Sequence, residues 1–481
     1  MRELTARALD LAQRRGASYA DIRIVQTREQ RIIVKNGQIA TLSEHTDQGF
    51  GVRVLVDGAW GFASSAELTA AEVDRVTAQA LEIARASGRV NAHRVDLGPP
   101  EVHTGRYETP VVIDPFTIPW EQKVDLLLRA DAEMRRTPQV KVSMASLEFI
   151  RVDKVFASTE GSFLEQTIIE SGGGMECHAV GDNEVQKRSY PNSFGRHQVT
   201  GGWEAIEDMN LVAHGARLGE EAVALLSAPP CPEGVTTLIL GPAQLALQLH
   251  ESCGHPIELD RVLGTEAAFA GTSFLTLDKL GAFRYGSEVV NITADATTPG
   301  GLGTFGWDDE GVPAQRVPIV REGIFVGYLT SRETAALLGQ RSSGAMRASG
   351  WNRLPIIRMT NINLEPGTWS FEDLLADTDH GIYMEMNKSW SIDDKRLNFQ
   401  FGTEVAYEIK GGKLGQLYRN ALYTGITSQF WQSCDAICNI DHWHVWGTPN
   451  CGKGQPIQVA HVGHGTAPAR FRNVQVGHVK A

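Results

Sequence analysis

Two histidines five positions apart constrain the local fold of this chain more than any other feature. His250 and His255 bracket the stretch His-Glu-Ser-Cys-Gly-His. On a straight α-helix, five steps of about 100° leave the second ring roughly 140° away from the first. The two rings converge only if the helix widens or breaks. Gly254 permits unusual backbone angles, and Pro256 disfavours the α region for the residue before it. We therefore expect His250 on the last turn of a helix and His255 at a break.

A histidine beside a glutamate, with a second histidine nearby, is typical of a hydrolytic metal site. In such a site His250 and His255 bind a divalent ion, and the carboxylate of Glu251 takes a proton from the bound water. The zinc protease motif has its histidines four residues apart on one helix face, so the spacing here departs from that motif. The alternative interpretation is a helix end that carries two unrelated histidines.

A third ligand would favour the metal site over this alternative. Cys451 lies in the glycine- and proline-rich loop 446–456, where a thiolate can approach a metal with little steric obstruction. Two neutral imidazoles and one thiolate leave a fourth tetrahedral position for water. The cysteine is far from the histidines in sequence, so only the fold can bring the two segments together.

Several motifs together resemble the TldD/PmbA metallopeptidase family, and specifically its metal-bearing TldD-type subunit. The motif His-Glu-x-x-x-His corresponds to residues 250–255, and a later Cys-Gly-Lys corresponds to residues 451–453. Further matches follow the same order along nearly the whole chain, in the stretches 49–54 (GFGVRV), 308–313 (DDEGVP) and 358–361 (RMTN).

This resemblance implies an intracellular peptidase that acts on short or unfolded peptides, with a metal held by His250, His255 and Cys451. It also implies a pairing with a paralogous PmbA-type (TldE-like) subunit that lacks the metal site. The predicted function is zinc-dependent peptide hydrolysis with Glu251 as the catalytic base, in a dimer formed with such a partner or with a second copy. One alternative is a non-catalytic scaffold or regulatory subunit, which should have lost one of these four residues. Another is a nucleic-acid-associated modulator, for example of a topoisomerase.

The charge balance argues against nucleic acid and membrane surfaces as partners. The chain has 481 residues and a formal net charge of −12, so it is a poor electrostatic match for phosphate backbones. No uninterrupted apolar run approaches the length that spans a membrane. Six dispersed cysteines are too few for a disulfide scaffold. We therefore expect a cytoplasmic protein with reduced thiols.

Periodicity and linker composition predict an α+β fold in two domains. The proline-rich stretch 227–234 is the best linker in the chain. It separates an N-terminal domain of mixed sheet and helices, residues 1–228, from a β-rich domain, residues 229–481, that carries the metal site.

Local signals predict individual elements within the first of these domains. Asn36-Gly37 and Asp57-Gly58 are strong hairpin turns. The glycines of residues 171–174 indicate a flexible turn, and residues 204–226 have the periodicity of one long helix.

Other histidines and a run of acids are further site candidates. The acids of residues 308–310 could contact a peptide amine or a cation, although a solvated turn explains them more simply. His461 or His464 could polarise a substrate carbonyl or orient a ligand. His442 and His444 could form a metal site close to Cys451, but packing or hydrogen bonding is the expected role, because no carboxylate base accompanies them.

The remaining cysteines and a glycine-rich stretch have structural explanations. Cys253, Cys434 and Cys438 are expected to be buried and unligated. Residues 301–306 match the dinucleotide-binding pattern, but the sequence that follows them is not a helix start, so close backbone packing near the active site is the better use of these glycines.

Overall fold

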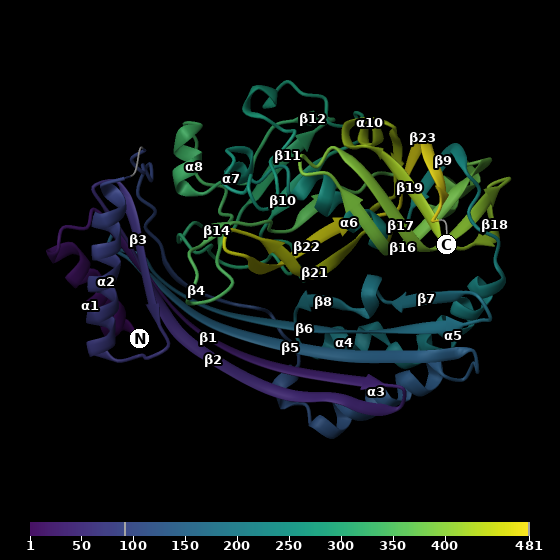
Figure 1. Ribbon diagram of the computed structural model, residues 1–481, viewed down its shortest axis with the longest axis horizontal. Helices are drawn as coiled ribbons and strands as arrows, with labels where there is room; N and C mark the ends of the chain where they lie inside the picture. Colours follow the sequence, from purple (N-terminus) through teal and green to yellow (C-terminus); the bar gives the residue numbers. More distant parts are fainter. Residues whose placement is uncertain (91–92, 480–481) are drawn as a thin grey trace.

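The computed structural model describes residues 1–90 and 93–479. Residues up to 227 form a long curved sheet with helices on its convex side, and residues from 234 onward lie against its concave side (Figure 1). Helices and strands are mixed, and the C-terminal half is rich in strands, which confirms the α+β fold class. Residues 228–233 connect the two halves; a domain boundary at residue 228 stays a prediction.

Four long antiparallel strands build the curved sheet. They are β1 (Tyr19–Lys35), β2 (Gln38–Val56), β5 (Val140–Ser158) and β6 (Phe163–Val180). Four shorter strands extend them, namely β3 (Ala59–Ser65), β4 (Thr104–Glu108), β7 (Val185–Tyr190) and β8 (His197–Thr200). The order is β3-β2-β1-β5-β6-β4, and β7 and β8 also pair with β6.

Both predicted hairpin turns are confirmed. Asn36 and Gly37 have φ values of 50° and 77°, and Asp57 and Gly58 have values of 53° and 77°. Two successive residues of positive φ are what a two-residue type I′ turn requires, and its twist matches that of the flanking strands. These turns fix the registers of β1 against β2 and of β2 against β3.

Two predictions about the first half are wrong. The glycines of residues 171–174 do not form a turn but lie inside β6. A side chain on Gly174 would come within 2.4 Å of the Gly195 carbonyl, so glycine here lets the segment after β7 pass close to the sheet. The single helix predicted over residues 204–226 is two helices, α4 (Glu204–Met209) and α5 (Leu211–Ser227), because Asn210 adopts a left-handed conformation between them.

Helices cover the two ends of the sheet separately. Helices α1 (Arg2–Arg14) and α2 (Ala70–Gly88) pack through small apolar side chains onto β1, β2 and β3. Helices α3 (Trp120–Met134), α4 and α5 pack onto β1, β5 and β6 around a second apolar core. The other face of the sheet is thereby left to meet the C-terminal half (Figure 1).

A closed barrel forms the centre of the C-terminal half. Its strands are β9 (Gly234–Leu240), β16 (His380–Ile392), β17 (Asn398–Lys410), β19 (Ala421–Ile426) and β23 (Ala469–His478). They pair in the order β16-β9-β23-β19-β17, and β16 also pairs with β17, which closes the ring. Strand β18 (Lys413–Tyr418) pairs with β17, and β20 (Cys434–Ile437) pairs with β23.

Smaller elements lie beside the barrel and share one apolar core with it. Strands β12, β11, β10 and β15 form a sheet in that order, and β21 (His444–Lys453) and β22 (Gln458–Thr466) form a hairpin. The remaining bounds are β10 (Ile292–Asp295), β11 (Arg316–Arg321), β12 (Ile324–Phe325), β13 (Met346–Arg347), β14 (Ile356–Ile357), β15 (Ile362–Leu364), α6 (Pro242–Leu249), α7 (Leu259–Val262), α8 (Arg332–Leu337), α9 (Phe371–Ala376) and α10 (Thr427–Gln432).

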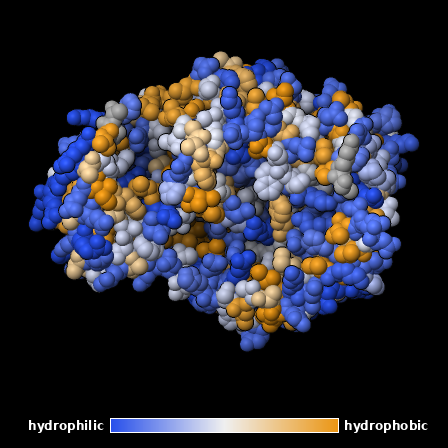
Figure 2. Space-filling model, viewed as in Figure 1, coloured by the Kyte–Doolittle hydropathy of each residue, from blue (hydrophilic) through white to orange (hydrophobic). Residues whose placement is uncertain are grey.

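Hydrophilic side chains cover most of the face shown in Figure 2, and apolar side chains lie between them in scattered groups. Within residues 1–90 and 93–479, no helix is both long enough and apolar enough to cross a membrane.

Two acids of the buried run 308–310, Asp309 and Glu310, form an ionic link between the two halves, so the simpler prediction of a solvated turn is wrong. Asp309 pairs with Lys154 Nζ at 2.6 Å and with Arg23 Nη1 at 3.5 Å, both on the curved sheet. Glu310 pairs with Arg53 Nη1 at 3.2 Å. Burial raises the pKa of Asp309, but the charges of Lys154 and Arg23 outweigh burial and hold it below its ordinary value.

Removing the central carboxylate of this link should destabilise the protein strongly. In the variant Asp309→Ala, Arg23 and Lys154 lose their counter-charge while they remain largely buried, which costs about 3–5 kcal/mol. The exposed pair Asp10–Arg14 provides the control, because Asp10→Ala should change stability by about 0.5 kcal/mol or less.

Urea unfolding monitored by circular dichroism measures both variants. Because the pKa of Asp309 is lowered on folding, its contribution should be present above the unfolded value of about 3.9 and lost as the pH falls through the lower folded value. Equal stability of the two variants at neutral pH would contradict the role of the ionic link.

Candidate metal centre

A widened helical turn places the two histidines on one face. Helix α6 continues into a π-helical turn, η3 (His250–Gly254), in which the His255 N–H donates to the His250 carbonyl at 3.2 Å. This bond spans five residues rather than four, so it brings the second ring back beside the first, with the ring centroids 4.9 Å apart.

The sequence analysis expected a break at His255, and this prediction is wrong, because the helix widens there and continues. His255 keeps helical angles, φ −69° and ψ −43°, although Pro256 follows it. The importance of Gly254 lies in its lack of a side chain and not in unusual backbone angles. A side chain at that position would come within 2.3 Å of the Met359 sulfur, so the turn could not pack where it does.

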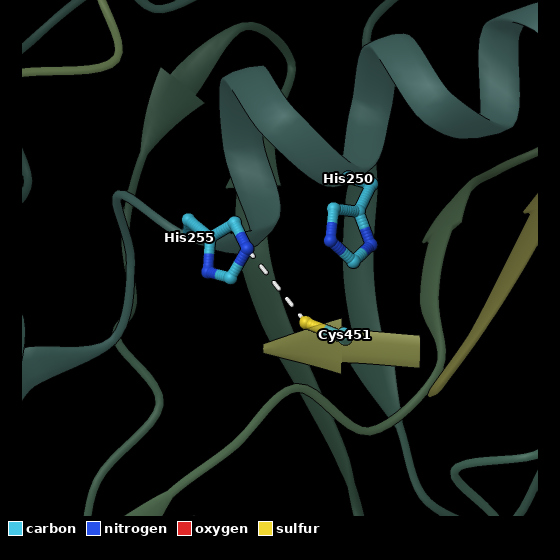
Figure 3. Close-up of side chains that lie close together, drawn as sticks. All are labelled: His250, His255 and Cys451. Atoms are coloured by element: carbon cyan, nitrogen blue, oxygen red, sulfur yellow. Dashed lines mark hydrogen bonds between the residues drawn. The ribbon is translucent and has the colours of Figure 1, made fainter. Parts of the chain in front are cut away.

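Cys451, on strand β21, lies beside the two histidines (Figure 3). The fold thus brings the two distant segments together, as expected. Its Sγ lies 3.7 Å from His255 Nε2. One possible ligand atom from each of the three residues lies within 4.8 Å of the others, and all three side chains are buried. Within the part of the chain that the structure describes, this is the one cluster of three or more histidine, cysteine, aspartate or glutamate side chains that could hold a metal ion.

Hydrogen bonds to the far nitrogens orient both imidazoles. His255 Nδ1 lies 3.0 Å from Glu258 Oε2, and the carboxylate can only accept, so the Nδ1 proton points to Glu258 and Nε2 is free to bind a metal. His250 Nδ1 lies 2.8 Å from His464 Nε2. Of the two late histidines considered for ligand orientation, His464 is therefore the one in place. His461 instead pairs with Glu170 at 2.6 Å.

Electrostatics at the cluster favour a thiolate at Cys451 and a neutral imidazole at His250. Burial raises the pKa of the Cys451 thiol, but the charges of His255 and Arg358 outweigh burial and bring it below its ordinary value. Burial lowers the pKa of His250. Arg358 also fixes the hairpin, since it donates to the carbonyls of Cys451 at 2.5 Å and of Gln458 at 3.0 Å.

Sequence reasoning missed a buried group of charges behind His255. Glu258 is fully buried, and Lys453 Nζ lies 3.6 Å from its Oε1. Burial raises the pKa of Glu258, but Lys453 and His255 outweigh it and lower the pKa to about 2. Lys453 also donates to Asp260 at 2.7 Å and to the Ile357 carbonyl at 2.6 Å. The sequence did place both residues next to the candidate ligands: Lys453 belongs to the Cys-Gly-Lys motif, and Glu258 lies three residues after the second histidine.

Glu251 turns away from this group and faces a cavity. Its Oε2 is paired with Arg396 Nη1, and Arg396 has a positive φ of 65°. Burial raises the pKa of Glu251, but the charges of His250, Arg396 and His255 outweigh it, so the pKa is lowered and the carboxylate is ionised.

The cavity has a volume of about 430 Å³ and lies where the two halves of the chain meet. Its walls come from the segment before β8, from α6 and the π turn, from the end of β16, and from β21. The side chains that line it include His250, Glu251, His255 and Cys451. The candidate ligands and the candidate base thus line one cavity.

The other candidates lie outside this cluster. His442 Nε2 accepts from the Phe371 N–H at 3.1 Å, which is the hydrogen-bonding role predicted for it. Cys253 is buried as expected, and burial raises the pKa of its thiol to about 12. Cys434 and Cys438 are also buried and unpaired. The glycine stretch 301–306 packs against Asn361, which accepts from the Gly303 N–H at 2.9 Å, and no helix follows it.

Curated relatives match almost the full length of the chain. A metalloprotease from Methanocaldococcus jannaschii is 32% identical over 443 residues, which is 92% of this chain and 94% of that protein. A zinc metalloprotease TldD homolog from Saccharolobus solfataricus is 24% identical and covers 94% of this chain and 95% of its own.

Two solved structures share the fold. A protein from Thermotoga maritima described as a modulator of a DNA gyrase has a TM-score of 0.79 at 20% identity and covers 99% of each chain. TldE from Thermococcus kodakarensis has a TM-score of 0.71 at 17% identity and covers 97% of this chain and 98% of its own. At such identities the likeness concerns the fold alone.

Three family models match consecutive parts of the chain. They are described as PmbA/TldA metallopeptidase domain 1, matched by residues 20–84, the central domain, matched by residues 113–227, and the C-terminal domain, matched by residues 233–478. The third contains the π turn and the Cys451 hairpin. These matches span most of the sequence, and the chain therefore belongs to the PmbA/TldD metallopeptidase family that its motifs resemble.

Proposed function

We propose that the protein is the zinc-dependent catalytic subunit of a TldD/TldE-like peptidase that hydrolyses short or unfolded peptides. The observation that carries the proposal is the grouping of three possible ligand atoms within 4.8 Å, beside Glu251 on the wall of a cavity. The names of the relatives support a metalloprotease, and one of those names specifies zinc.

The donor set fits a zinc ion. His250, His255 and Cys451 offer two imidazoles and a thiolate, a combination that suits zinc and leaves a fourth tetrahedral position open. The Nδ1 atoms of both histidines are already engaged, by His464 and Glu258, so their Nε2 atoms are available to the ion. The lowered pKa of Cys451 favours the ionised form of this ligand.

When bound, zinc supplies a Lewis acid that lowers the pKa of a coordinated water toward neutrality and polarises the scissile carbonyl. Glu251 takes the proton of the attacking water on Oε1, because its Oε2 is paired with Arg396, and then passes that proton to the leaving amine. Glu258 keeps the Nδ1 proton of His255 in place throughout.

The alternative of a non-catalytic scaffold or regulatory subunit has less support. Such a subunit has no need of an assembled ligand set with a carboxylate beside it. Here all four residues are present, and the fold brings them to one cavity.

The first test is metal content. Purified protein should carry about one zinc per chain by plasma mass spectrometry, and a chelator should abolish peptide cleavage until zinc is restored. Cys451→Ala should lose most of the zinc, because one of three ligands is removed. Cys177→Ala, at a buried cysteine of the curved sheet, is the matched control and should keep it. Full activity without metal would refute the zinc-dependent mechanism.

The second test separates the base from the ligands. Glu251→Gln should retain zinc, since the carboxylate is not among the ligand atoms, and should lose about 10²–10⁴ in kcat. The exposed Glu372→Gln serves as the control and should leave both values unchanged. Zinc content and turnover are measured on the same preparations. Loss of zinc from Glu251→Gln would show that the carboxylate is a ligand instead.

The third test concerns assembly. A peptidase inside a cell must be kept from folded proteins, and enclosure of its site within an oligomer admits only extended chains. We expect a stable dimer with a TldE-like paralogue or with a second copy, measured by size-exclusion chromatography with light scattering, with and without the co-expressed paralogue. The dimer should cleave a peptide and spare the same sequence inside a folded domain. A fully active monomer that cuts folded protein would contradict the enclosure.

A further inference from the structure

The cavity beside the candidate metal centre contains a positive charge that the proposed mechanism does not use. Arg196, which follows the short 3₁₀ turn Ser193–Gly195, lines the cavity together with His250, Glu251 and His255. Its side chain is half-buried. Within residues 1–90 and 93–479 it forms no hydrogen bond and no ion pair, although many other arginines of the chain are paired with a carboxylate.

The surrounding charges leave this guanidinium uncompensated. Glu251 is the one carboxylate among the described residues that line the cavity, and it already forms an ion pair with Arg396. The charge of Arg196 acts to lower the pKa of Glu148 and of Glu176, but neither carboxylate comes within ion-pair distance of the guanidinium. With a divalent ion bound, the positive charges of the ion, Arg196 and Arg396 would together exceed the two negative charges of the Cys451 thiolate and Glu251. The cavity is then an attractive environment for an anion.

The segment that carries Arg196 is held rigidly in the cavity wall. The Ser193 hydroxyl accepts from the Asn387 N–H of β16 at 2.8 Å. The Phe194 ring packs edge-on against Trp390 of the same strand, with centroids 5.9 Å apart. Phe194 also has a positive φ of 62°, a conformation that a bulky residue keeps only when its surroundings enforce it. The close approach of Gly195 to Gly174 anchors the other side.

An unpaired guanidinium on an anchored backbone segment, lining the same cavity as a reaction centre, suits a planar carboxylate, which it can bind through two parallel hydrogen bonds. The volume of about 430 Å³ accommodates a few peptide residues. Building on the function proposed above, we propose that Arg196 is a specificity-determining residue that binds a carboxylate of the peptide substrate. That carboxylate is supplied either by the C-terminus of a short peptide or by an acidic side chain near the scissile bond.

Two pairs of tetrapeptides distinguish the two sources. One pair is Ala-Ala-Ala-Ala as the free acid and as the C-terminal amide. The other pair is Ala-Ala-Glu-Ala and Ala-Ala-Gln-Ala, both amidated. Calorimetric titration of chelator-treated protein measures binding without turnover, and kcat/KM of the zinc-loaded protein measures cleavage.

We expect the wild type to favour the carboxylate member of one pair by about ten- to a hundredfold in affinity and in kcat/KM, mainly through KM. Arg196→Gln should remove that preference and leave the values for the uncharged member unchanged. Arg196→Lys should restore part of the preference, because it keeps the charge but not the planar fork. Arg89→Gln, at an exposed arginine after α2, should preserve the wild-type ratio. Thermal unfolding confirms that each variant is folded.

The outcomes separate this inference from the function on which it rests. Loss of the acid-over-amide ratio in Arg196→Gln supports the C-terminal source, and loss of the Glu-over-Gln ratio supports the side-chain source. Ratios near one in the wild type, or ratios that Arg196→Gln does not change, overturn the inference even if zinc-dependent cleavage is found. Absence of cleavage with an Arg196-dependent binding ratio would overturn the proposed function and leave the carboxylate site standing.

Discussion

A single backbone hydrogen bond, from the His255 N–H to the His250 carbonyl, determines whether the candidate centre can form. An ordinary helical turn would direct the two rings to different sides. The wider turn directs both toward the Cys451 hairpin, and it leaves Glu251 pointing into the cavity. The turn is stable in this form because its surroundings are shaped for it, with Met359 packed where a side chain on residue 254 would otherwise lie.

Buried charges hold the pieces of the centre at fixed distances. Glu258 accepts from His255 and faces Lys453, which lies on the same hairpin as Cys451. Arg358 ties that hairpin together through two carbonyls. Buried charges of this kind are costly unless they are paired, so displacement of one member disturbs the others. The site is therefore supported by a connected network rather than by three independent side chains.

The sequence indicated which three residues the fold brings together, but it indicated little of what surrounds them. The types and spacing of His250, His255 and Cys451 carried chemical information that does not depend on context. Pro256 suggested a break because its effect on the preceding residue is a statistical preference, which tertiary packing overrode. The acids at 308–310 looked solvated because no local pattern shows that Arg23, Arg53 and Lys154 come from another part of the chain to meet them. Glu258 and Lys453 each lie beside a motif residue, but no local pattern shows that their two segments meet, so the pairing was missed.

The order of pairing in the barrel has a consequence for how the chain matures during synthesis. Strand β9, which immediately precedes α6 and the π turn, pairs with β16 and with β23, the last strand of the fold. A nascent chain therefore exposes the histidine segment long before the strand that completes its support has left the ribosome. Cys451 also emerges late. An ion captured by the early histidines alone would be weakly held, so the proposed metal centre would load stably only after completion of the whole barrel.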